Sequence, residues 1–280
     1  MKLSREAGHA MGLLNRLNEI ARLLLRYPKI GKIVSSFFGA IEVVLLDTIR
    51  FLDRHTRLNY FPDLMKQFTR VYKSQVIPIN ASLEAVPAVS PTEEILGVVR
   101  RVSSLAISYC YCRSAHRNCD NDVWTCIHVG TAESLKEIGK RIPMKSATLN
   151  EVENLIQRSH EAGLVHQLLT APSPDYFYVI CNCCPCCCVM LRSAIDHGIA
   201  DTMLASNFVS VQNQEACNDC GLCIERCHFG ARSLEESQLL YRPDRCAGCG
   251  LCVTSCKNRA IAMERRAGGG YKKPLYPLDS

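Results

Sequence analysis

The chain has 280 residues, 18 cysteines, 48% hydrophobic residues and a formal net charge of +6. This length is enough for one large domain or for two or three small ones. Lys2 and Arg5 are not followed by an uninterrupted apolar core and a cleavage site, so we expect no secretory signal peptide, a cytoplasmic location and reduced thiols rather than disulfides.

The basic character belongs to the N-terminal region. Residues 1–75 carry thirteen Lys and Arg against six Asp and Glu, a net +7 that leaves −1 for the rest. Apolar spacing predicts a helix over residues 12–27 and an amphipathic helix over residues 33–54. The longest uncharged stretch of the second has nine residues, whereas a membrane span needs roughly 20 apolar ones. We therefore expect these helices to dock on the core, on a partner or at a membrane surface.

The next segment contains proline without clear periodicity. Pro78, Pro87 and Pro91 predict a linker over residues 76–91. Ser90 and Glu93 form a capping box pattern that predicts a helix running to about residue 102.

The middle region alternates predicted helices and strands. A helix is expected near residues 132–140, and another starts at Thr148, where Glu151 completes a capping box. Strands over residues 164–170 and 176–180 follow, around a proline-containing turn. A helix followed by two strands predicts a winged-helix-like arrangement. Nucleic-acid binding is not expected, because Arg158 is the only Arg or Lys between residues 148 and 180.

Ten cysteines of the middle region fall into two short groups, which indicates metal binding rather than scattered buried thiols. The groups are Cys110, Cys112, Cys119 and Cys126, and then Cys181, Cys183, Cys184, Cys186, Cys187 and Cys188. The first group alone could hold a cubane, or the two groups jointly one or two iron-sulfur clusters. Zinc in one group is the alternative to the iron-sulfur interpretation, since four thiolates suffice for it.

Neighbouring residues give the second group a predicted setting. Pro185 is expected to open a helix that ends near Gly198, with residues 186–188 in its first turn, where free backbone N–H groups stabilise thiolates. Arg113 is expected either to bind an anion or cluster sulfur, or to pair with Asp120. We interpret His128 and His166 as structural histidines.

Eight cysteines near the C-terminus repeat the spacing C-x2-C-x2-C-x3-C with an offset of 29 residues at every position. Such a duplication indicates two iron-sulfur clusters. The repeats are Cys217, Cys220, Cys223 and Cys227, and Cys246, Cys249, Cys252 and Cys256.

On these residues, the chain over about 211–264 resembles the bacterial-type ferredoxin domain with two 4Fe-4S clusters. In that arrangement the last cysteine of each run ligates the other cluster. The resemblance implies that Cys217, Cys220, Cys223 and Cys256 hold one cluster. It likewise implies that Cys246, Cys249, Cys252 and Cys227 hold the second.

One feature departs from that family. Its members usually have proline after the fourth cysteine of each run, where this chain has His228 and Lys257. These residues, with Arg232 and Arg259, place positive charge near the clusters. Because positive charge favours the reduced state, we expect a raised reduction potential.

Residues 92–198 resemble a cysteine-rich module that occurs beside ferredoxin domains in poorly characterised proteins of anaerobes. The resemblance rests on the run Cys110-Tyr-Cys112-Arg113 and on the cysteines of residues 181–188. It implies no settled activity.

The predicted fold class is α+β. It comprises N-terminal helices (1–75), the linker (76–91), a mixed, winged-helix-like middle domain (92–210), a pseudo-twofold ferredoxin domain of ββα-type repeats (211–264) and a disordered tail (265–280). The predicted function is iron-sulfur electron transfer that passes single electrons to a redox partner protein. The alternatives are a ferredoxin-fused reductase or reductive activase with a reactive cluster on the middle cysteines, and a redox-sensing regulator. No nucleotide or flavin fingerprint is evident, so an enzyme would take its electrons from a partner.

Overall fold

A computed structural model describes residues 73–90, 93–102, 104–129, 142–170, 177–199, 203–236 and 238–267, together with Val44 and Thr48, which are both helical. The helices predicted over residues 12–27 and 132–140 lie outside the described residues, as do the rest of the 33–54 helix and the tail beyond residue 267. Within the described ranges, no helix is long and apolar enough to cross a membrane.

A mixed seven-stranded sheet forms the centre of the larger unit, with the strand order β4-β2-β3-β6-β5-β1-β7. Its strands are β1 (Lys73–Val76), β2 (Leu105–Tyr109), β3 (Trp124–Val129), β4 (Met144–Ser146), β5 (Val165–Thr170), β6 (Phe177–Cys183) and β7 (Met203–Leu204). All neighbours are antiparallel except β1 and β7, which run parallel.

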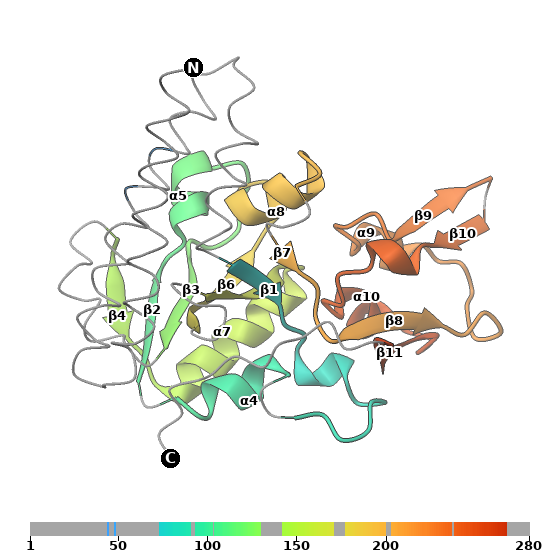
Figure 1. The fold of residues 1–280 in the computed structure, drawn as a ribbon, viewed down its shortest axis with the longest axis horizontal. Coiled ribbons are helices and arrows are strands. Elements are labelled where there is room, and N and C mark those ends of the chain that lie inside the picture. Colours follow the sequence, from blue (N-terminus) through green and yellow to red (C-terminus); the bar gives the residue numbers. More distant parts are fainter. Residues whose placement is uncertain are drawn as a thin grey trace.

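Helices cover the sheet on two sides. α4 (Ile95–Val99) and α7 (Leu149–Glu161) lie across one face, whereas α5 (Tyr111–His116) and α8 (Val189–Ile195) lie beside each other on the other side (Figure 1). The capping box predicted at Thr148 is confirmed: its side chain accepts from the Glu151 backbone while the Glu151 carboxylate accepts from Thr148.

The hairpin expected as a two-stranded wing is instead the middle of the sheet. β5 and β6 pair with each other, and they also pair with β1 and β3 on their outer edges. Val165 and Ile180, which point to opposite faces, are both fully buried. Such strands are covered on both faces, which a free wing would not be.

Residues 76–90, which belong to the segment expected as a linker, are part of the fold. Val76, Ile77 and Ile79 are at most 3% exposed, and the short turn η1 (Asn80–Ser82) follows them. The next helix begins later than predicted, because the Glu94 carboxylate rather than Ser90 caps it by accepting from the backbone N–H groups of residues 96 and 97.

The C-terminal unit repeats the order strand, helix, strand rather than the expected ββα order. Its elements are β8 (Phe208–Gln212), α9 (Leu222–Glu225), β9 (Arg232–Glu235), β10 (Gln238–Tyr241), η4 (Pro243–Arg245), α10 (Leu251–Ser255) and β11 (Ile261–Arg265). β8 pairs with β11 and β9 with β10, so the first and last strands close the unit. The coarse α+β class is confirmed.

Polar contacts join this unit to the end of α7. Arg226 donates to the carbonyl oxygens of His160 and Glu161 at 3.2 and 2.9 Å. The His160 ring lies 2.7 Å from the Thr254 hydroxyl in α10. The His228 ring lies 2.8 Å from the carbonyl oxygen of residue 163. These contacts fix the position of the C-terminal unit against the larger unit.

Candidate metal centres

The eight cysteines of the C-terminal unit surround two cavities. Cys217, Cys220, Cys223 and Cys256 line the outer cavity. Cys227, Cys246, Cys249 and Cys252 line the inner cavity. Each cavity thus takes three cysteines from one repeat and the fourth from the other. These are the two sets that the sequence predicts as ligands.

The loops that carry these cysteines depend on left-handed backbone. Gly221 and Gly250, which occupy the same position in the two repeats, both have φ +78°. Asp219 and Gly248 form a second matched pair, with φ +51° and +71°. A Cβ atom on Gly248 would lie 2.1 Å from the Phe208 carbonyl oxygen. Glycine lets the chain turn there and pack closely. Thiol donors around a cavity framed by apolar side chains fit a four-thiolate iron-sulfur cluster.

The two cavities differ in their surroundings. Cys220 is exposed, and a Cβ on Gly221 would meet nothing within 4 Å. In the second repeat, a Cβ on Gly250 would lie 2.3 Å from the Ser82 hydroxyl. The outer cavity therefore faces solvent, and the inner one packs against the larger unit.

Arg232 is a buried cation between the two cavities. It is 2% exposed, donates to the Ser210 hydroxyl at 3.1 Å and lies over the Tyr241 ring at 4.4 Å. Burial raises the pKa of both Cys223 and Cys252, the latter to about 11, and Arg232 acts against that rise at both thiols. The other expected cations, Lys257 and Arg259, are exposed.

Six of the ten middle cysteines form one group, which we call the six-thiol group. Their thiols contact one another in the order Cys110, Cys126, Cys181, Cys183, Cys188, Cys112.

Sheet register explains the six-thiol group. Ile127 pairs with Ile180, and both belong to the apolar core on the α7 side. Because side chains alternate along a strand, the cysteines one residue further, Cys126 and Cys181, point to the opposite face. Cys112 lies in α5, and Cys188 caps α8. These two helices thus bring the last two thiols over the same face.

The thiols of this group differ in acidity. Hydrogen bonds from Cys110 and Cys181 hold the pKa of Cys126 well below its usual value, although burial opposes this. Cys112 and Cys183 do the same for Cys188. The group thus favours thiolates at two positions, as a metal-binding set requires.

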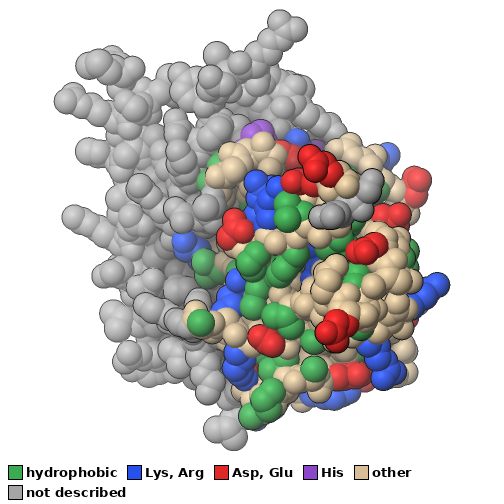
Figure 2. Space-filling model, turned by 90° about the vertical axis from the view of Figure 1, so that its right-hand side faces the viewer, with side chains coloured by type: hydrophobic (Ala, Val, Ile, Leu, Met, Phe, Trp, Pro, Cys, Tyr) green, Lys and Arg blue, Asp and Glu red, His purple; other side chains and the backbone are tan. Residues whose placement is uncertain are grey.

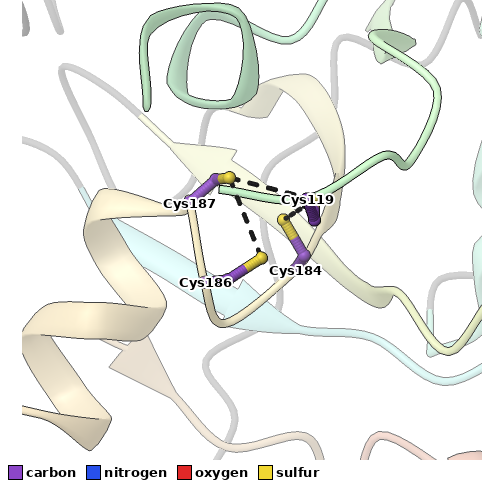
Figure 3. A group of neighbouring side chains, drawn as sticks. All are labelled: Cys119, Cys184, Cys186 and Cys187. Carbon is purple, nitrogen blue, oxygen red and sulfur yellow. Dashed lines mark hydrogen bonds between the residues drawn. The ribbon is translucent and has the colours of Figure 1, made fainter. Parts of the chain in front are cut away.

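The other four middle cysteines form a separate group, which we call the four-thiol group (Figure 3). Cys119 comes from the loop after α5, and Cys184, Cys186 and Cys187 come from the turn between β6 and α8. Their four sulfur atoms lie within 4.8 Å of one another. Burial raises the pKa of Cys119, but hydrogen bonds from Asn121, Cys186 and Cys184 prevail and lower it to about 6.

The helix expected to open at Pro185 begins four residues later. α8 starts at Val189, with Cys188 as its cap residue. The backbone N–H groups of Cys187 and Cys188 both donate to the Cys184 carbonyl oxygen, at 3.4 and 3.1 Å. The cysteines therefore lie in a tight turn that precedes the helix rather than in its first turn.

Arg113 lies between the two middle groups and is 1% exposed. It donates to the Thr125 hydroxyl at 2.8 Å and to the Asn182 carbonyl oxygen at 3.1 Å, and it also bonds the backbone of Asp122. The expected pairing with Asp120 is not among these contacts. Burial acts to lower its pKa, but Cys110 and Cys184 outweigh burial and raise it. Its charge faces the thiols.

A chain of buried histidines, which sequence reasoning missed in part, runs between the two units. His160 lies 3.3 Å from His166, whose other ring nitrogen is 2.6 Å from the Asn182 side chain. Burial lowers the pKa of His160 to about 3 and that of His166 to about 4. His128 is partly buried, and desolvation lowers its pKa to about 4. His160 shares the apolar face of α7 with Ile156, a spacing that could have identified it.

The comparison with known families agrees with the C-terminal geometry. Residues 240–262 match the family model described as a 4Fe-4S binding domain. The matched segment spans Cys246, Cys249, Cys252 and Cys256. No curated protein matches the chain. The match indicates a 4Fe-4S cluster, and with it an iron-sulfur electron-transfer protein.

Proposed function

We propose that this chain transfers electrons between a redox partner protein and a buried iron-sulfur centre in its own larger unit. The outer and inner cavities of the ferredoxin unit would each hold a 4Fe-4S cluster through the four cysteines that line them. The six-thiol group would hold a further cluster. When bound, such clusters take up and release one electron at a time.

The packing between the units carries this proposal. Cys249, which lines the inner cavity, packs against the same apolar cluster that contains Cys183 and Cys188. Ala247 and Leu251 of the ferredoxin unit are buried in that cluster as well, at 6% and 0% exposure. Buried apolar side chains therefore lie between the inner cavity and the six-thiol group. Tight apolar packing of this kind would keep an electron donor in the inner cavity close to an acceptor in the six-thiol group and shield both from solvent.

The opposite side of the ferredoxin unit is suited to a partner. Cys220 is exposed there, and Leu234 on β9 is 58% exposed. Acidic, basic and apolar side chains intermingle on this face (Figure 2). Mixed polar and apolar surfaces of this kind are typical of transient interfaces. Electrons would therefore enter beside Cys220 and leave the ferredoxin unit beside Cys249.

A metal count on anaerobically purified protein tests this assignment. Two cubanes account for about eight iron atoms, and a third cluster brings the count to about twelve with matching sulfide. We expect about twelve, and about eight in the double variant C126S/C188S, which lacks both low-pKa thiols of the six-thiol group. About eight in the unmodified protein would remove the larger unit from the electron path.

A second function rests on the number of thiols. A cubane uses four protein thiolates, whereas the six-thiol group offers six. Two surplus thiols beside a cluster favour a reductase, in which the centre reacts with a small molecule or activates a partner enzyme. A substrate-linked change in the spectrum of the middle centre, absent in C126S/C188S, would support this function over plain electron transfer.

A further inference from the structure

The spacing of the four-thiol group sets it apart from the cluster cavities. The sulfur atoms of Cys119 and Cys184 are 3.6 Å apart, those of Cys119 and Cys187 3.9 Å, and those of Cys186 and Cys187 3.8 Å. A metal ion bonded to four thiolates at about 2.3 Å in a tetrahedron requires sulfur atoms about 3.8 Å apart. These three separations match that single-ion geometry, and all four sulfur atoms lie within 4.8 Å of one another.

A cubane would require a wider arrangement. Each thiolate of a cubane binds a different iron atom at a corner of the cluster, so the four thiolates surround a cage rather than an ion. The cysteines of the C-terminal unit instead line two cavities, four thiols around each. Among the described residues, only the four-thiol group brings its possible ligand atoms within 4.8 Å of one another, close enough to share one ion.

Neighbouring amides hold the thiols in place. Asn118 donates to the Cys186 carbonyl oxygen at 2.8 Å, which ties the loop after α5 to the turn before α8. Asn121 donates to the Cys119 sulfur at 3.4 Å. Outer contacts of this kind orient ligands and are a regular part of protein metal sites.

We propose that Cys119, Cys184, Cys186 and Cys187 bind one thiophilic divalent ion, zinc or a single iron, as a closed tetrathiolate site. Thiolates select such ions over Mg²⁺ or Ca²⁺. Four protein ligands leave no open position, which is typical of a structural site. The ion would clamp the loop after α5 to the turn before α8, and so fix the two helices that carry Cys112 and Cys188. This site is separate from the electron path, because its thiols pack in a different apolar cluster around Leu164.

The test compares metal content in matched serine variants of the full chain, purified without oxygen. We expect about one zinc per chain, or about one iron without sulfide, and at least about a fivefold loss of that ion in C119S. The cluster iron and sulfide of C119S should stay within a tenth or so of the unmodified protein. The control C112S, which changes the six-thiol group, should keep the single ion.

X-ray absorption on the unmodified protein keeps the proposal testable if C119S does not fold. A zinc edge with four sulfur neighbours at about 2.3 Å and no metal neighbour supports it. If iron occupies the site instead, cobalt(II) substitution should give the intense visible bands of tetrahedral cobalt thiolates, and C119S should lose them. The proposal is overturned if C119S loses about four iron atoms with matching sulfide, or if the single ion persists in C119S.

Discussion

Replacement of Arg232 by glutamine should lower the reduction potential of the clusters proposed for the outer and inner cavities. The guanidinium is buried at 2% exposure between the two cavities and interacts with Cys223 of one and Cys252 of the other. Glutamine keeps much of the volume and a hydrogen-bond donor for Ser210 but removes the positive charge. Because reduction adds negative charge to a cluster, losing a nearby cation makes reduction less favourable.

The size of the effect follows from Coulomb's law. At a separation of about 6 Å and an effective dielectric constant of about 20, one unit charge contributes about 3 kcal/mol. For a one-electron couple that energy corresponds to roughly 120 mV. Water entering beside the shorter side chain screens part of it, so we expect a fall of about 50–100 mV.

Protein-film voltammetry of R232Q, R232K and K257Q measures this. Lys257 is exposed beside Cys256, so removing its charge controls for bulk electrostatics. We expect R232K to stay near the unmodified potential and K257Q to shift by less than about 20 mV, since exposed charges are screened. Equal shifts in R232Q and K257Q, or a raised potential in R232Q with full iron content, would refute the role of the buried cation.

Four further substitutions test the packing and the ionisable groups. Alanine at Gly248 should abolish the cluster of the inner cavity, with a loss of about four iron atoms, because its Cβ would lie 2.1 Å from the backbone of residue 208. Alanine at Gly221 faces open space, so it should lower the free energy of unfolding by only about 1 kcal/mol. The pKa of Glu93 is lowered to about 2, chiefly by the hydrogen bond from Arg265. The ionised Glu93 carboxylate therefore stabilises the fold fully above pH 4.5, and this contribution is lost as the pH falls through about 2. Urea unfolding should show that E93Q lowers the free energy of unfolding by about 1–2 kcal/mol at pH 7 and not at all below pH 2. Burial lowers the pKa of His160 to about 3 from an ordinary 6.5, so stability should fall as the pH drops between these values, and a slope unchanged in H160Q would contradict a buried neutral ring.

The two cysteine sets that line the cavities of the C-terminal unit could be predicted from sequence because their pattern is local. Three cysteines of each set lie within seven residues, and the spacing itself turns them inward. The glycines of the two Cys-Gly-Leu-Cys runs have the left-handed backbone that such a turn needs, both at φ +78°. Arg232 could be predicted as a nearby charge but not as a buried one, because its burial depends on strand pairing with distant residues.

The division of the ten middle cysteines into two groups could not be predicted, because it depends on where the strand β6 ends, three residues beyond the expected end. The expected strand ended at Ile180, whereas β6 continues through Cys183. That extension places Cys181 and Cys183 on one face of the sheet and leaves Cys184 in the turn beyond it.

The same strand end separates the two thiol groups for which we propose different metal centres. Cys183 belongs to the six-thiol group, and Cys184 to the four-thiol group, although they are adjacent in the chain. Arg113 interacts with both thiols, and its buried guanidinium lies between the two groups. Thiolate sets so close would otherwise repel each other in a poorly screened interior. A guanidinium that cannot lose its proton offsets that repulsion for both sets. On this argument, R113M should reduce the occupancy of both middle sites together while leaving the ferredoxin clusters in place, which metal counts on the variant can decide.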